Sequence, residues 1–373
     1  MRRFRPIAYK RAMLNRVWRH WSPAVGIDLG TARTRLVTPQ HGVVLDEPSV
    51  VAVRDEAGGR SGSAGEVLGR GTAVGRLARQ MIGRTPDGIR AVCPLRDGAI
   101  TDFALCEAML RYFLNKALPR VARLPVAAAK PSVIVATPHR LTSVERQAVF
   151  NSVERSGAGR VRLVDSAAAA AVGSGLPIGE PIASLLCDIG AGTTDVALMS
   201  LGATVATESI RTAGAACDEA IATWMRRHHS LRIGPGTAEQ IKREIGSALP
   251  LPSERDTEVR GLDTVGGIPR RSVVTSEEIR EAIADCLDQI ADAIRRTIER
   301  VNPELVADLA ETGLVLSGGG AELPRLDEAL EQRLGLPVRR AEQPSLTVAA
   351  GLEVLLDHDG RWDDILTRHR AAV

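Results

Sequence analysis

The sequence predicts an α/β protein built from two similar halves. An apolar run over 185–189 ends in a glycine-rich turn and is followed by a second apolar run. An earlier stretch over 25–34 repeats the same order of apolar residues, Asp, Gly and Thr. Strand-length apolar runs also alternate with amphipathic helical segments along the chain, which is typical of an α/β fold.

Composition and charge exclude several classes of protein. The 373 residues are 44% hydrophobic and 25% charged, an ordinary soluble composition. A membrane-spanning helix needs about 20 consecutive apolar residues, and no apolar run in the sequence is that long. Five cysteines without CxxC spacing indicate reduced, buried thiols in a cytosolic protein. Outside residues 1–21, 41 basic residues face 45 acidic ones, so nucleic-acid binding through a basic face is not expected.

The first 21 residues differ from the rest of the chain. They carry seven basic residues and no acid, together with Trp18 and Trp21. A helix here would gather Ile7, Leu14 and both tryptophans in one arc, a pattern typical of anionic membrane surfaces. A disordered basic tail is the alternative. A cleaved signal is disfavoured because no continuous apolar segment is present.

The first half is expected to begin with a hairpin and to alternate strands with helices. Thr142 and Glu145 form a capping box for one of these helices, and the glycine-rich segment 54–75 is linker-like. The expected strands cover 25–34 (as a hairpin), 50–53, 132–138 and 161–164. The expected helices cover 106–118, ending before Pro119, then 142–157 and the slim alanine helix 167–171.

The second half is expected to follow the same scheme after its own hairpin at 185–196. Thr275 and Glu278 form a second capping box, which begins a long amphipathic helix that ends before Pro303. The other expected elements are helices over 218–228 and 237–247, a hairpin-like region over 250–272, a strand over 313–316, a helix beginning at Pro324 and a last helix over 345–356.

Each hairpin turn carries the elements of a phosphate site. Glycines adopt backbone angles closed to other residues, so successive N–H groups can converge on an anion. Asp28 and Asp188 end the preceding strands, where they could hold hydrated Mg²⁺. Neither turn is a P-loop or a dinucleotide fingerprint, because no Lys-Ser/Thr pair follows and no helix opens directly. One such turn could be purely structural, but the matched pair favours nucleotide phosphates.

The two hairpins, together with Leu314–Ala321 and its triple glycine, resemble the superfamily of actin, DnaK-type chaperones and sugar kinases. Within it the chain resembles the MreB/Mbl group of bacterial cell-shape actins, from about Val25 to about Leu356. The resemblance implies an actin-like ATPase fold, with two lobes that each hold a mixed sheet flanked by helices and a nucleotide cleft between them. It places the first lobe at 22–166 plus 336–373, its outer subdomain at about 52–94, the second lobe at 167–335 and its outer subdomain at about 208–272.

The resemblance also implies a site for ATP and Mg²⁺. Asp28 and Asp188 would hold the metal through water, and Glu239 and Lys242 would hold the ribose and base. A solvated ion pair is the alternative for those two side chains. The phosphates would contact both turns, at Gly30, Thr31, Ala32, Arg33, Gly190, Ala191, Gly192 and Thr193. The adenosine would lie against bare backbone at Gly318, Gly319 and Gly320.

The chain departs from the family pattern near the expected nucleotide. Ser166-Ala167 stands where the family has Glu-Pro, and that Glu is thought to orient the attacking water; Asp165 lies one residue early. Arg33 replaces a small amide, Ala191 replaces a glycine, and Ala215 replaces an Asp. We expect nucleotide binding with slow or lost hydrolysis, hence at most a weak ATPase.

The resemblance implies a cytoskeletal protein that forms filaments at the inner face of the cell membrane and contributes to cell shape or cell-wall organisation. Its expected partners are further copies of itself, an anionic membrane contacted by residues 1–21, and proteins of the cell-wall or division machinery. The alternatives are a non-polymerising nucleotide-binding scaffold and, on the same fold, a small-molecule kinase.

Overall fold

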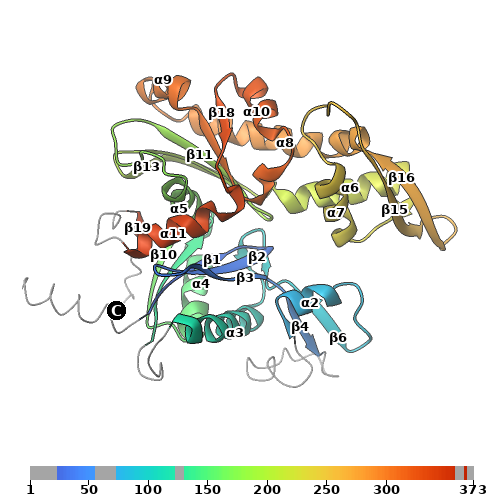
Figure 1. Ribbon diagram of the computed structural model, residues 1–373, viewed down its shortest axis with the longest axis horizontal. Coiled ribbons are helices and arrows are strands. Elements are labelled where there is room, and N and C mark those ends of the chain that lie inside the picture. Colours follow the sequence, from blue (N-terminus) through green and yellow to red (C-terminus); the bar gives the residue numbers. More distant parts are fainter. Residues whose placement is uncertain (1–22, 55–72, 122–129, 358–364, 368–373) are drawn as a thin grey trace, which may run out of the picture.

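The computed structural model describes residues 23–54, 73–121, 130–357 and 365–367 (Figure 1). The segment 1–21, on which the membrane prediction depends, and most of the linker-like stretch 54–75 lie outside these residues. Within the described part of the chain, no helix is long and apolar enough to cross a bilayer. All five cysteines are free and four are buried, but Cys93 is exposed, contrary to the expectation of buried thiols.

The first half is organised on a six-stranded sheet of order β19-β10-β9-β1-β2-β3. Its central strand β1 pairs antiparallel with β2 and parallel with β9. Helices α3 (Phe103–Val121) and α4 (Ser143–Arg155) pack against it through a largely aliphatic core that also holds the buried Phe113. The strand bounds are Ala24–Leu29 (β1), Arg33–Thr38 (β2), Gly42–Pro48 (β3), Ser132–Thr137 (β9), Arg160–Asp165 (β10) and Leu366–Thr367 (β19).

The second half repeats this arrangement on a five-stranded sheet of order β13-β12-β11-β17-β18. Its central strand β11 pairs antiparallel with β12 and parallel with β17, as β1 does with β2 and β9. The predicted similarity of the two halves is therefore present in the strand pairing. The bounds are Ser184–Ile189 (β11), Thr194–Ser200 (β12), Ala203–Ile210 (β13), Leu314–Ser317 (β17) and Val338–Arg340 (β18), with helices α8 (Ser276–Ile298), α9 (Pro303–Thr312) and α10 (Leu326–Leu334).

Each half carries a smaller outer part, and both lie on the right of Figure 1. The outer part of the first half comprises β4 (Val51–Arg54), β5 (Ala73–Val74), β6 (Ile89–Val92) and α2 (Arg76–Met81). That of the second half comprises α6 (Gly214–His228), α7 (Pro235–Ile245), β14 (Leu231–Arg232), β15 (Asp256–Asp263) and β16 (Pro269–Thr275). A short hairpin of β7 (Leu95–Arg96) and β8 (Ala99–Ile100) leads from the first outer part to α3.

Two helices cross between the halves, α5 (Ser166–Gly173) and α11 (Thr347–Asp357) (Figure 1). All five alanines of α5 are buried, as the slim-helix prediction requires. The backbones approach so closely that a Cβ at Gly351 would lie 1.7 Å from the Ala169 carbonyl oxygen. A Cβ at Gly173 would lie 2.0 Å from the Thr347 carbonyl oxygen. Small residues on both helices therefore make this crossing possible.

Local signals in the sequence account for the starts of three long helices. Both predicted capping boxes, at Thr142 and at Thr275, are present. Helix α3 begins earlier than predicted, because the Asp102 side chain accepts the Leu105 N–H at 3.0 Å. It also continues through Pro119 to Val121, so the predicted stop is wrong. A proline in the last turn removes only one hydrogen bond near the helix end.

One expected lobe boundary does not match the hydrogen bonding. Strand β18 pairs in parallel with β17 of the second sheet, although the boundary at residue 336 assigned it to the first lobe. The loop and helix α10 between β17 and β18 form a crossover that returns the chain to the same sheet. The chain passes to the α5–α11 crossing only after β18.

Candidate functional site

The two hairpin turns share one geometry. The Gly30 N–H donates to the Arg33 carbonyl at 3.1 Å, and the Gly190 N–H donates to the Thr193 carbonyl at 2.9 Å. These two N–H groups close the turns, so they do not serve as the anion donors that the sequence suggested. Any N–H groups that face an anion must come from the residues between them.

The two turns meet at one place in the molecule. A Cβ at Gly192 would lie 2.5 Å from Thr31 Oγ1, so only glycine fits there. The Gly98 N–H, in the β7–β8 turn, donates to the same Oγ1 at 3.1 Å. The structure thus brings the predicted phosphate-binding residues of both halves together.

Asp188 is the most deeply buried carboxyl of the predicted site. It is 8% exposed, and its Oδ1 accepts a hydrogen bond from Ser317 Oγ at 2.9 Å. Burial, followed by the negative charge of Asp195, raises the pKa of Asp188 to about 7. Burial also raises the pKa of Asp28, and Arg35 opposes this effect.

Two arginines of β2 have partners that the sequence analysis did not predict. Arg35 Nη1 lies 3.2 Å from Asp28 Oδ2, whereas Arg33 Nε lies 2.7 Å from Asp46 Oδ1 on β3. Arg33 is therefore bound to the neighbouring strand. The register of the first hairpin could have indicated the contact of Arg35 with Asp28, since Arg35 stands directly opposite Asp28 in the β1–β2 pair.

The carboxylates at the strand ends fit a hydrated divalent cation. Mg²⁺ usually binds one or two carboxylates and keeps several waters. Asp188 supplies a buried carboxyl and Asp28 a partly buried one, and the charge of Asp28 helps to raise the pKa of Asp188. Arg35 shares Asp28 with any such ion. No group of three or more His, Cys, Asp or Glu residues with the geometry of a metal site occurs among the residues that the structure describes.

Glu239 and Lys242 both lie on α7, but each is bound to protein. Glu239 pairs with Arg79 of α2, across the two outer parts, and more distantly with Arg243. Lys242 Nζ lies 2.7 Å from Asp218 Oδ1 and donates to the Gly214 carbonyl at 2.6 Å. Glu239 and Lys242 therefore do not form the solvated ion pair with each other that the sequence analysis gave as the alternative. A ribose or base that bound them would have to share their protein partners.

The triple glycine serves two purposes. A Cβ at Gly318 would lie 2.3 Å from the Ile189 carbonyl oxygen, and a Cβ at Gly320 would lie 2.3 Å from Ile189 Cγ2. These two glycines are required by packing on β11 rather than by a ligand. A Cβ at Gly319 would meet nothing within 4 Å, so Gly319 is the one that leaves open space.

Ser166 is the first residue of α5, and Asp165 precedes it as the N-cap residue. Asp165 Oδ2 lies 2.7 Å from Nδ1 of His139, and Asp165 Oδ1 lies 3.5 Å from Nη2 of Arg146. Asp165 is thus engaged by two side chains that the sequence did not single out. The sequence could have indicated the contact of Asp165 with His139, because His139 follows strand β9 and Asp165 ends the adjacent parallel strand β10.

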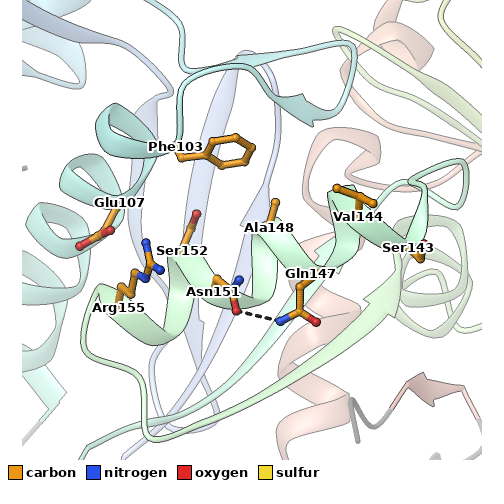
Figure 2. Close-up of a pocket in the computed structure, with 9 residues that line it drawn as sticks. All are labelled: Phe103, Glu107, Ser143, Val144, Gln147, Ala148, Asn151, Ser152 and Arg155. Carbon is orange, nitrogen blue, oxygen red and sulfur yellow. Dashed lines mark hydrogen bonds between the residues drawn. The ribbon is translucent and has the colours of Figure 1, made fainter. Parts of the chain in front are cut away.

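A separate groove lies on the outer side of the first half, between α3 and α4. Figure 2 shows Phe103 and Glu107 on α3 facing residues of α4, where Gln147 donates to Asn151 at 2.8 Å. Phe103 and Val144 are exposed at its rim. None of its lining residues belongs to the hairpin turns.

Comparisons with known proteins agree with this architecture. The family model for MreB/Mbl protein matches residues 22–363. Cell shape-determining protein MreB of Escherichia coli (strain K12) is 42% identical over 352 residues, covering 93% of this chain and 98% of that protein. Cell shape-determining protein Mbl of Bacillus subtilis (strain 168) is 40% identical over 334 residues, covering 90% and 96%.

Solved structures give the same result. The crystal structure of MreB 5 of Spiroplasma citri bound to AMPPNP superposes with a TM-score of 0.80 at 32% identity, covering 90% of this chain and 96% of that one. Fold, strand pairing and sequence therefore agree along nearly the whole chain, which belongs to the MreB/Mbl family of actin-like proteins.

Proposed function

We propose that this protein binds ATP with Mg²⁺ between its two halves. The observation that carries the proposal is the meeting of two equivalent hairpin turns, each preceded by a strand with an Asp near its end, buried in Asp188 and partly buried in Asp28. The Spiroplasma citri relative bound to AMPPNP, an ATP analogue, supports it. In this proposal both turns contact the phosphates, Asp28 and Asp188 hold Mg²⁺ through water, and Gly319 lies against the adenosine.

We further propose that the protein assembles with itself into filaments at the cytoplasmic face of the membrane and contributes to cell shape. Membership of a family with cell shape-determining relatives supports this proposal. The basic segment 1–21 would supply the membrane contact, and proteins of the cell-wall or division machinery would be partners. Hydrolysis would be slow, because a serine at position 166 cannot accept a proton as a carboxylate does.

Binding is tested by calorimetry of ATP with Mg²⁺ on the full chain and on Asp188→Ala. The variant should lose metal-dependent binding, because it removes one of the two carboxyls that would hold the hydrated ion. Equal affinity of the variant and the parent would show that the assigned site is wrong. Pelleting by ultracentrifugation with and without ATP–Mg²⁺ separates a filament protein from a non-polymerising scaffold.

A further inference from the structure

His139 lies where three parts of the site meet: the end of β9, the start of α5 and the turn of the second hairpin. Its backbone N–H donates to Asp195 Oδ1 at 3.3 Å. The other oxygen of Asp195 accepts a hydrogen bond from Thr193 Oγ1 at 3.0 Å. One buried carboxylate therefore links His139 directly to the predicted phosphate-binding turn.

The imidazole of His139 is oriented by Asp165. With Nδ1 2.7 Å from Asp165 Oδ2, an ionised Asp165 places the ring proton on Nδ1 and leaves the lone pair on Nε2. Arg146 holds the pair in place, because its Nη2 donates to the His139 carbonyl at 2.8 Å and lies 3.5 Å from Asp165 Oδ1. The His139 side chain is 44% exposed, so water can reach the ring.

We propose that His139, oriented by Asp165, accepts the proton of the water that attacks the γ-phosphate in this chain. The proposal rests on the proposed binding of ATP. The water oxygen bonds to the γ-phosphorus while the bond from that phosphorus to the β,γ-bridging oxygen breaks. ADP leaves with the bridging oxygen, and the water proton passes to Nε2 and later to solvent. Ser166 has no group that could take this proton at neutral pH.

The charges around His139 set the pH at which it can act. Asp165 and, more weakly, Asp195 raise the pKa of His139, whereas partial burial and Arg146 lower it; the net direction is upward. Arg140 is the adjacent residue in the chain and donates to the Ser209 carbonyl at 3.4 Å. Only the neutral ring can accept a proton, so turnover should rise with pH and level off above the raised pKa.

The test is single-turnover phosphate release from ATP–Mg²⁺ across the neutral pH range. His139→Gln should lower the high-pH rate by about 10²-fold and abolish the pH dependence. Asp165→Asn should move the midpoint to lower pH, because it removes the charge that raises the pKa of the ring. His41→Gln, which changes an exposed histidine in the β2–β3 turn, should behave as the parent.

Two further measurements separate a chemical role from a structural one. Imidazole added to His139→Ala should restore part of the rate, which a folding defect would not allow. Binding of a fluorescent ATP analogue should stay within a few-fold of the parent in every variant. A parent that does not bind ATP overturns both proposals. A parent that binds ATP but has no turnover, or that keeps its rate and pH profile in His139→Gln, overturns only the role of His139.

Discussion

At the scale of one residue, the burial of Asp188 is expected to destabilise the protein when no cation is bound. Its carboxyl is buried against Ser317 and close to Asp195, and its pKa is raised to about 7. In an unfolded chain the side chain of an aspartate ionises near pH 4. Between these values the folded state binds the extra proton, so the free energy of unfolding falls as pH rises toward 7. Above pH 7 the folded protein carries a buried negative charge, which a bound cation would neutralise.

We expect Asp188→Asn to stabilise the protein without nucleotide or metal, and more so at pH 8 than at pH 5. Each unit of pKa difference corresponds to about 1.4 kcal/mol, so the extra gain at high pH is on the order of 1–3 kcal/mol. Thermal unfolding in a chelating buffer measures it, with the exposed Asp256→Asn as the matched control. An equal gain at both pH values would mean that Asp188 is ionised throughout that range.

At the scale of elements, an ion pair joins the two outer parts of the molecule. Arg79 of α2 binds Glu239 of α7, 160 positions away in the sequence. Glu239 is also one of the two side chains, with Lys242, that the resemblance assigns to the ribose and base. The Arg79–Glu239 pair therefore links α2 to α7, and it engages a side chain that the proposed nucleotide site would also use.

Removing this contact should speed the release of nucleotide. Arg79→Ala is expected to raise the dissociation rate of a bound ATP analogue by at most about fivefold, because a partly exposed ion pair contributes about 1 kcal/mol or less. Arg243→Ala is the matched control, since Arg243 also faces Glu239, at 4.0 Å, but lies on the same helix. Stopped-flow displacement measures the rates. Equal effects of the two variants would argue that the link between α2 and α7 is unimportant for release.

The crossing of α5 and α11 gives a second prediction at this scale. Gly351→Ala should destabilise the protein by about 1–3 kcal/mol or more, because the added methyl group meets the Ala169 backbone and the two helices must separate. Gly236→Ala places the same methyl group on helix α7, where nothing lies within 4 Å. That control should unfold at the temperature of the parent or slightly above it. A similar melting temperature for both variants would contradict the close crossing.

At the scale of the whole molecule, the sequence predicts elements better than it predicts partners. The hairpins and capping boxes follow from residues that are neighbours in the chain, so their patterns are visible without a structure. The partners of Lys242 and Glu239, and the contact of His139 with Asp165, depend on how distant segments pack. Gly318 and Gly320 show the same limit, because only the packed β11 reveals that Ile189 excludes their side chains.

The last prediction concerns the attachment of the whole molecule to a membrane, which rests on the sequence of residues 1–21. The seven basic residues there should each contribute on the order of 1 kcal/mol near an anionic surface at low salt. The rest of the chain carries more acidic than basic residues and offers no comparable attraction. The full chain should therefore float with anionic vesicles, and a chain that begins at residue 22 should not.

Two controls separate charge from apolar insertion in this experiment. Neutral vesicles should bind the full chain weakly, and added salt should release it from anionic ones, because screening weakens exposed charges. A double variant, Trp18→Ser with Trp21→Ser, keeps all seven basic residues but removes the aromatic side chains suited to the headgroup region. It should retain part of the flotation at low salt and lose it at moderate salt. Equal flotation of the full and shortened chains would remove residues 1–21 from the membrane contact and direct the search to the folded part.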